Sequence, residues 1–264
     1  MNLASSDQLA QMLAAELPDQ PRWIETRSML RSGHAAVFGG PRVADGFAVR
    51  LLHGPFSVVA IVGRPPAAAI LSALEGATPM TPILAQADAA ADVERALIER
   101  AAAGVPSGWH RERVVVHRLT GAGEPTVASG PSVAVRLLAE ADPLEQVLPG
   151  LRFEIGHAVG IVPVAAAFVD GVAASFCYPC WITESLWDVS VDTIPAYRRR
   201  GLAAQAARFM IAHQRREGRE PVWGAVESNG ASLRLAERLG FTPIDELYAF
   251  SRGPWAFLTN GYNG

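Results

Sequence analysis

The stretch VDTIPAYRRRGLAAQ (Val191–Gln205) carries three consecutive arginines into a glycine, after which an apolar helical pattern begins at once. The start of a helix presents backbone N–H groups without intrahelical partners, together with the positive end of the helix dipole. Gly201 allows a ligand to approach the backbone closely, and the arginines add donors whose geometry suits phosphate. The junction is therefore either an ordinary solvated turn or a cradle for an anion, most simply a pyrophosphate.

Strands and helices are predicted on both sides of this junction from the period of the apolar residues. The predicted elements are a strand over 185–193, a helix over 202–218, a strand over 221–227, a short helix over 231–240 and a strand over 241–250. Upstream of them, Asp170-Gly171 is a favoured turn pair and predicts a hairpin. The capping pattern of Asp142, Pro143 and Glu145 predicts one more helix, beginning at residue 142.

The composition excludes several classes of function. The 264 residues include no lysine, so a P-loop lysine, a Schiff base and a lysine general base are all excluded. A net charge of −3 argues against a nucleic-acid partner. The N-terminus has no basic segment followed by an apolar core, and the most apolar run, Ala158–Val169, is too short to cross a bilayer. We therefore expect a cytoplasmic protein with no membrane partner.

A linker dense in Gly, Pro, Ser and Thr, TGAGEPTVASGP (Thr120–Pro131), divides the chain. We predict an N-terminal α/β domain over 1–120 and a second domain over 131–264. In the first domain, the apolar patterns predict strands over 56–63 and 113–119 and helices over 66–76 and 91–104. No arginine run that ends in a glycine opens a helix in this domain, which argues against a second site of the same kind.

Two ordered motifs in this chain resemble those of the GCN5-related N-acetyltransferases. RRRGLA (Arg198–Ala203) fits the family signature (Gln/Arg)-x-x-Gly-x-(Gly/Ala), and it stands where that signature is expected, after a strand and at the start of a long helix. The second motif, ESNGASLRLAERLGF, contains Asn229 before a helix and Gly240-Phe241 at its end. The resemblance covers residues 151–250, and the wording of both motifs is most similar to the zwittermicin-resistance-like branch.

The resemblance implies an α/β (α+β) fold in which a mixed sheet is flanked by helices. It makes the N-terminal domain either a degenerate copy of that fold or a domain that covers the substrate. It also implies acetyl-CoA as co-substrate, with the pyrophosphate on the arginine junction and a backbone N–H near Val191 polarising the thioester carbonyl. The residues expected to contact the coenzyme are Val191, Arg198, Arg199, Arg200, Gly201, Leu202, Ala203, Asn229 and Ser232.

The resemblance also names the kinds of group that move protons. Family members often use a carboxylate on the strand before the junction as the base, and Glu184 and Asp188 are the choices here. Four residues apart in a regular strand, they would share a face. The general acid of the family is commonly a tyrosine seven positions after the asparagine, where this chain has Ala236. Tyr248, Tyr178 or solvent is left to protonate the thiolate.

We therefore predict an N-acetyltransferase that moves an acetyl group from acetyl-CoA to a primary amine of a small molecule or peptide. The alternative is a non-catalytic acyl-CoA sensor or interaction module, which Ala236 motivates. Cys177 and Cys180 form a lone CxxC pair without a nearby histidine, so we expect apolar packing there and no metal. No nucleic acid or membrane partner is expected, and a homodimer is left open.

Overall fold

The computed structural model describes residues 3–52, 57–75, 81–102, 104, 108–121 and 133–252. The chain divides into two compact units. The first comprises Met1–Val116, Ala225–Asn229 and Pro243–Trp255, and the second comprises His117–Gly224, Gly230–Thr242 and Ala256–Gly264. Nearly all of the predicted linker lies outside the described residues, so the division into 1–120 and 131–264 stays a prediction.

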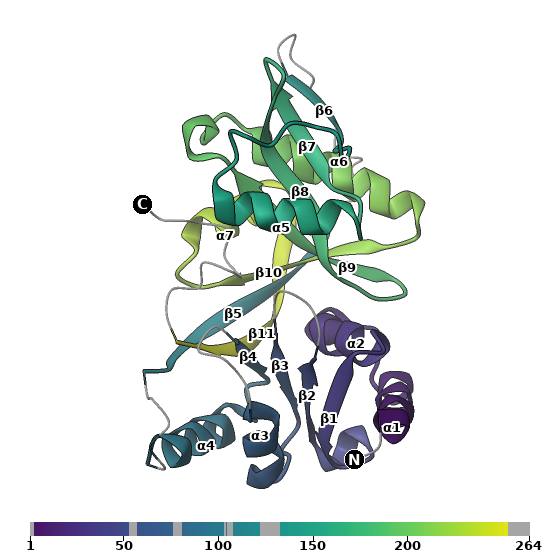
Figure 1. The fold of residues 1–264 in the computed structure, drawn as a ribbon, viewed down its shortest axis with the longest axis vertical. Coiled ribbons are helices and arrows are strands. Elements are labelled where there is room, and N and C mark those ends of the chain that lie inside the picture. Colours follow the sequence, from purple (N-terminus) through teal and green to yellow (C-terminus); the bar gives the residue numbers. More distant parts are fainter. Residues whose placement is uncertain are drawn as a thin grey trace. The chain divides into compact units, whose positions relative to one another are not determined.

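The first unit begins with two helices and continues with alternating strands and helices (Figure 1, purple to blue). Its elements are α1 (Leu3–Glu16), α2 (Ile24–Arg31), β1 (Ala35–Gly39), β2 (Phe47–Leu51), β3 (Val59–Val62), α3 (Ala67–Leu74), β4 (Ile83–Ala85), α4 (Ala90–Ala102) and β5 (His110–Leu119). In α4 the buried side chains recur every three or four residues, at Ala90, Val93, Ala96 and Leu97, which is the spacing of a helix with one face in the core.

The second unit holds the predicted junction (Figure 1, teal to yellow). Its elements are β6 (Val133–Leu137), α5 (Pro149–Val159), β7 (Ala165–Val169), β8 (Val172–Ile182), β9 (Leu186–Thr193), α6 (Leu202–Arg216), β10 (Glu220–Val226), α7 (Gly230–Arg238) and β11 (Phe241–Ser251). The C-terminal parts of β10 and β11 are grouped with the first unit. The strands and helices predicted on both sides of the junction are thus confirmed.

In the first unit the strand order is β1-β2-β3-β4-β11-β5. β1, β2 and β3 are antiparallel neighbours, whereas β3 and β4 are parallel and are joined by α3. All residues of β3 are buried, so both faces of the sheet are covered. α3 and α4 pack on one face through a core that includes Ile61, Ile70, Leu74 and Val93.

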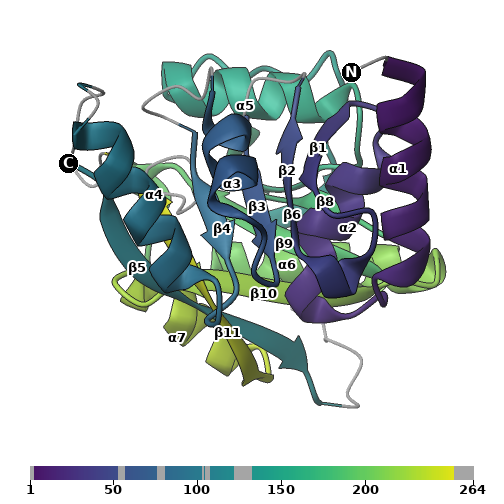
Figure 2. The same ribbon diagram turned by 90° about the horizontal axis from the view of Figure 1, so that it is seen from below.

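In the second unit the strand order is β5-β10-β9-β8-β7-β6. β6, β7, β8 and β9 are antiparallel neighbours, whereas β9 and β10 are parallel and are joined by α6. α5 and α6 lie on opposite faces of this sheet (Figure 2). Phe176, Tyr178 and Ile194 pack with Ile155 of α5, and α6 contacts strands β6 to β9 from the other side. The predicted α/β (α+β) fold with a mixed sheet flanked by helices is therefore confirmed.

The two units repeat one arrangement of elements. In each, three antiparallel strands lead into a helix and then into a strand parallel to the third: β1-β2-β3-α3-β4 in the first unit and β7-β8-β9-α6-β10 in the second. A further helix follows in both, α4 and α7. The N-terminal part of the chain is thus a second copy of the same topology, one of the two alternatives stated for it above.

One local prediction fails and another holds. No helix begins at Asp142, because its carboxylate instead accepts hydrogen bonds from the Ala139 N–H at 2.7 Å and from Arg136 at 2.6 Å, and α5 begins at Pro149. The predicted hairpin is confirmed as β7 and β8, with Asp170 and Gly171 at positive φ in its turn. No helix in the described part of the chain is long and apolar enough to span a membrane.

Candidate functional site

The junction between β9 and α6 has an unusual backbone. After β9 the chain makes a short 3₁₀ turn over Pro195–Tyr197 and reaches α6 with Arg199 at φ 62° and Gly201 at φ 75°. A positive φ is uncommon for a residue with a side chain such as Arg199, and Gly201, directly before α6, is in the left-handed region as well. The first N–H groups of α6 are donors without intrahelical partners. The start of α6 therefore suits an anion.

The three arginines of the junction are exposed. The Arg198 Nε donates to the Thr193 carbonyl oxygen at 3.3 Å, which fixes that side chain beside the end of β9. The Arg200 guanidinium lies 5.5 Å from the centre of the Tyr197 ring, a cation–π distance. The Leu202 side chain is buried, so only its backbone can reach a ligand. The junction thus presents both backbone and guanidinium donors to solvent.

β9 and β10 are paired over only part of their length. Among the residues that the structure describes, the parallel register joins Leu186, Trp187 and Asp188 to Glu220, Pro221 and Val222, and it goes no further. β9 continues to Thr193 and β10 to Val226. Beyond Asp188, the edge of β9 that faces β10 therefore carries backbone groups that the sheet does not use.

Val191 points its backbone toward that edge. The Ile194 N–H donates to the Ala174 carbonyl oxygen of the neighbouring chain segment at 2.9 Å. Hydrogen-bonded residues alternate along an antiparallel pair, so Asp192 bonds to β8 while the N–H and C=O of Val191 point away from β8. An extended ligand along this edge could form strand-like hydrogen bonds with Val191.

Asn229 and Ser232 lie around the start of α7. Asn229 immediately precedes the helix, and its N–H donates to the Val226 carbonyl oxygen at 2.9 Å. Ser232 is in the first turn of α7, and its hydroxyl accepts a hydrogen bond from the Trp223 indole N–H at 2.9 Å. Asn229 is grouped with the first unit and Ser232 with the second, so a common role for them at the junction stays a prediction.

The three residues expected to move protons belong to different elements. Glu184 is exposed in the turn before β9, so the shared-face argument does not apply to it, whereas Asp188 lies within β9 at its last pair with β10. Tyr248 is in β11, opposite Ala85 of β4, and its ring packs against the core of the first unit. The Arg111 guanidinium lies 5.0 Å from the centre of that ring. Their catalytic roles remain predictions.

A group of titratable side chains that the sequence did not single out as a cluster lies on the face of β8 and β9 that α5 covers. Asp192 is 8 % exposed, and Tyr178, which lies on β8 opposite Ser190, two residues before Asp192, is 7 % exposed. The Tyr178 hydroxyl hydrogen-bonds to the Asp192 carboxylate, and the charges of Glu154 on α5 and of Arg198 act on Asp192 as well. Side chains that are an even number of residues apart in a strand point to the same face. The sequence could therefore have placed Asp192 on the face of Asp188, four residues away.

Burial dominates the electrostatics of this cluster. It raises the pKa of Asp192 to about 7, and the negative charge of Glu154 adds to the rise, while Arg198 and the hydrogen bond from Tyr178 act in the opposite direction. Burial likewise raises the pKa of Glu154 to about 7 and that of Tyr178 well above its ordinary value. Two carboxyl groups that titrate near neutral pH are suited to exchange protons with a substrate.

The other candidate groups are simpler. Cys177 is buried and Cys180 is exposed, and both thiols are free. Within the described residues, no group of three or more His, Cys, Asp and Glu side chains could hold a metal ion. Ala236, at the position of the family tyrosine, is fully buried in α7.

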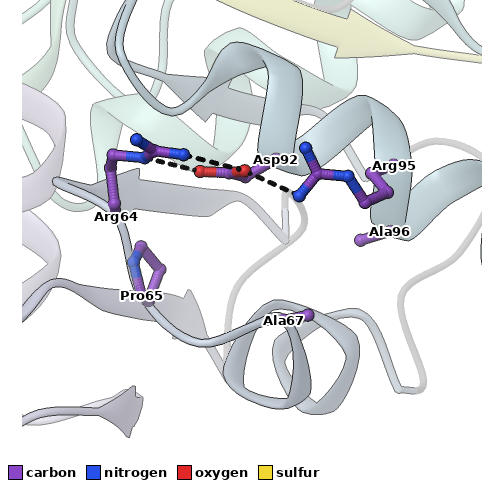
Figure 3. A pocket seen from close by; sticks show the side chains of 6 residues that line it. All are labelled: Arg64, Pro65, Ala67, Asp92, Arg95 and Ala96. Carbon is purple, nitrogen blue, oxygen red and sulfur yellow. Dashed lines mark hydrogen bonds and ion pairs between the residues drawn. The ribbon is translucent and has the colours of Figure 1, made fainter.

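The first unit has a cavity at the equivalent junction, between β3 and α3 (Figure 3). It measures about 380 Å³ and is lined by Arg64, Pro65, Ala67, Asp92, Arg95 and Ala96. Arg64 and Arg95 both point at Asp92, with nitrogen–oxygen distances of 2.9 and 3.0 Å. The hydrogen bond from Arg64 is the main reason that the pKa of Asp92 is lowered. The Asp92 carboxylate therefore already engages both arginines of this cavity.

Comparisons with known proteins agree with this geometry. Residues 157–250, just over a third of the 264 residues, match the family model described as GNAT acetyltransferase. No curated protein matches the chain. The family match covers β7 to β11, and thus the β9–α6 junction and the unpaired edge of β9.

Solved structures share the fold over nearly the whole chain. A GCN5-related N-acetyltransferase-like protein from Streptococcus suis is 18 % identical, with a TM-score of 0.66, and the match covers 95 % of this chain and 99 % of that one. A GCN5-related N-acetyltransferase from Kribbella flavida is 17 % identical, with a TM-score of 0.57 and coverages of 96 % and 97 %. A tandem GNAT protein from the clavulanic acid biosynthesis pathway is 15 % identical, with a TM-score of 0.53 and coverages of 95 % and 96 %. The tandem protein in particular shares the two-unit architecture.

Proposed function

Because the chain belongs to the GNAT acetyltransferase family through its residues 157–250, we propose that it transfers an acetyl group from acetyl-CoA to a primary amine of a small molecule or peptide. The observation that carries the proposal is the combination of the β9–α6 junction with the unpaired edge of β9. The junction suits an anion, and the unpaired edge of β9 suits an extended chain. The two are adjacent in the second unit. CoA offers a pyrophosphate joined to an extended pantetheine arm.

The residues present fit this co-substrate. The backbone N–H groups from Arg199 to Ala203 would hold the pyrophosphate, with the exposed guanidinium groups of Arg198 to Arg200 around it. The Val191 N–H would donate to the thioester carbonyl oxygen and stabilise the negative charge that develops on it as an amine attacks, and the Val191 C=O would accept a hydrogen bond from an amide N–H of the pantetheine arm. Leu202 serves through its backbone, and its side chain anchors α6 in the core.

The acceptor would approach the end of β9 from the side of the sheet opposite α6, next to the part that α5 covers. α6 covers one face of the sheet, and the Asp192 side chain lies on the other face, where its carboxylate meets Tyr178 and Glu154. A neutral amine on that side could approach a carbonyl carbon held beside Val191. The family match and the fold support acyl transfer, and the choice of amine as acceptor is the further step of this proposal.

The test is a thiol-release assay with acetyl-CoA and the purified full-length chain, screened across amine classes. The classes are small amines, amino acids, aminoglycoside-type antibiotics and peptide N-termini. We expect amine-dependent release of free CoA, with one acetylated amine formed per thiol, as measured by mass spectrometry. Thiol release that does not depend on any amine would show a hydrolase and contradict the proposal.

A second candidate is a non-catalytic acyl-CoA sensor. The fully buried Ala236 favours it, because the position of the family tyrosine has neither a hydroxyl group nor space for one. The same assay separates the two functions. A sensor would bind CoA in a calorimeter and release no thiol with any amine class.

A further inference from the structure

The buried cluster between α5 and the β8–β9 pair contains an oxygen with an unused hydrogen-bonding position. Within the described residues, the Oδ2 atom of Asp192 is buried and accepts no hydrogen bond. Asp192 is more than nine-tenths buried, and its carboxylate is held by the Tyr178 hydroxyl. A buried carboxylate oxygen without a donor is costly, so such an atom in a native structure calls for a ligand donor. An amine N–H is a donor of the required kind.

We propose that Asp192 is the base that takes the proton from the acceptor amine, with Tyr178 and Glu154 as positioning residues that set its orientation and its charge. This proposal rests on the acetyl transfer proposed above. Neither Glu184 nor Asp188, the residues expected from the family pattern, fills this role in it.

Distance along β9 favours Asp192 over its rivals. Asp192 directly follows Val191, whose N–H points to the unpaired edge where the thioester carbonyl would lie. Asp188 is three residues before Val191, roughly 10 Å along a strand, and Glu184 is farther still in an exposed turn. A base must come within a hydrogen bond of the attacking nitrogen or act through one water. Among the three carboxylates, Asp192 is the one nearest to Val191 along β9.

The proton and electron balance is simple. The nitrogen lone pair of a neutral amine forms the bond to the carbonyl carbon, and the nitrogen's surplus proton passes to the Asp192 carboxylate. The carbon–sulfur bond breaks with its electron pair on sulfur, and the thiolate takes a proton from solvent. Asp192 then returns its proton to solvent by way of Glu154, which is partly exposed on α5.

The surroundings of Asp192 predict a specific pH dependence. The charged and titratable groups facing it are Tyr178 and Cys180 on β8, Asp188 on β9, Glu154 on α5 and Arg198 after β9. With a pKa of about 7, Asp192 is protonated and inactive as a base at acidic pH, so kcat should rise with pH through neutrality. Removing the hydrogen bond of Tyr178 should raise that pKa further, whereas removing the charge of Glu154 should lower it.

The experiment compares four variants with the wild type, using acetyl-CoA and the amine that gives the fastest thiol release. kcat is measured at saturating acceptor from pH 5 to 9, alongside CoA affinity by calorimetry and the melting temperature. Asp192→Asn should lower kcat by about 10²–10⁴ and abolish the acidic limb, with CoA affinity within a few-fold of wild type. Tyr178→Phe should move the limb to higher pH and Glu154→Gln to lower pH. Asp188→Asn is the rival variant.

The outcomes separate this proposal from the proposed function. The assignment of the base is overturned if the acidic limb of the kcat–pH profile persists in Asp192→Asn, or if it disappears in Asp188→Asn instead. Acetyl transfer would still stand in either case. Shifts in the same direction for Tyr178→Phe and Glu154→Gln also overturn it, and these two variants decide the matter even if Asp192→Asn fails to fold. A wild-type protein that releases no thiol with any amine overturns both proposals together.

Discussion

Gly201 and Gly218 flank α6 in the same left-handed conformation, with φ of 75° and 78°. An added Cβ would meet nothing within 4 Å at either position. A substitution therefore strains the backbone equally at both, although only Gly201 adjoins the arginine junction. This pair allows the effect on coenzyme binding to be separated from the effect on folding.

We predict that Gly201→Asp weakens CoA binding by more than about tenfold, because it places a carboxylate where the pyrophosphate would lie. Gly218→Asp should leave CoA affinity unchanged, while both variants lose a similar amount of thermal stability. Calorimetric titration and melting temperatures check this. Equal CoA affinity in the two variants would contradict a phosphate site at the junction.

At the scale of single residues, sequence reasoning reaches the junction but only part of the cluster behind it. Strand alternation is a local signal, and it places Asp188 and Asp192 on one face. It does not tell which of the two is buried, because burial depends on α5, a helix from another part of the sequence. Glu154 belongs to α5, and no spacing rule relates a helix to the strand that it covers. The capping pattern at Asp142 fails for a similar reason, since Arg136 competes for its carboxylate.

At the scale of elements, the strand–glycine–helix order was predictable, since turn residues and apolar periods are local signals. The short pairing of β9 with β10 was not, because register is decided by two strands together with the helix that crosses between them. The packing of the β3–α3 junction was not predictable either, because it involves a loop from another part of the chain. Gly46 of that loop lies so close to the junction that an added Cβ would be 2.5 Å from the Pro65 nitrogen and 2.7 Å from the Arg64 carbonyl carbon.

We predict that Gly46→Ala destabilises the chain by on the order of 3 kcal/mol, because it combines a backbone clash with a φ of 73°. The control is Gly33→Ala, which has a φ of 72° and nothing within 4 Å, and should cost only about 1 kcal/mol. Denaturant unfolding measures both. Equal losses in the two variants would mean that the loop and the junction do not pack as described.

At the scale of the whole molecule, the chain holds one topology twice, yet no repeat is visible in its sequence. Topology depends on the order and period of apolar residues, and many sequences satisfy the same order. The two junctions have diverged in the groups that bind anions. Pro65 and Pro66 lack the backbone N–H groups that the second unit offers, and Asp92 already engages Arg64 and Arg95. We therefore predict that the first unit does not bind the coenzyme.

A calorimetric titration of CoA into the full-length chain tests the coenzyme site most directly. We expect one equivalent of CoA per chain, because the second unit supplies N–H groups and exposed arginines, while the first supplies prolines and a carboxylate that is already paired with arginines. Binding should weaken at high salt, as expected for a pyrophosphate held by exposed cationic groups. A stoichiometry of two, or one equivalent whose affinity is lost in a variant of Arg64 and Arg95 and kept in Gly201→Asp, would contradict the assignment of the site to the β9–α6 junction.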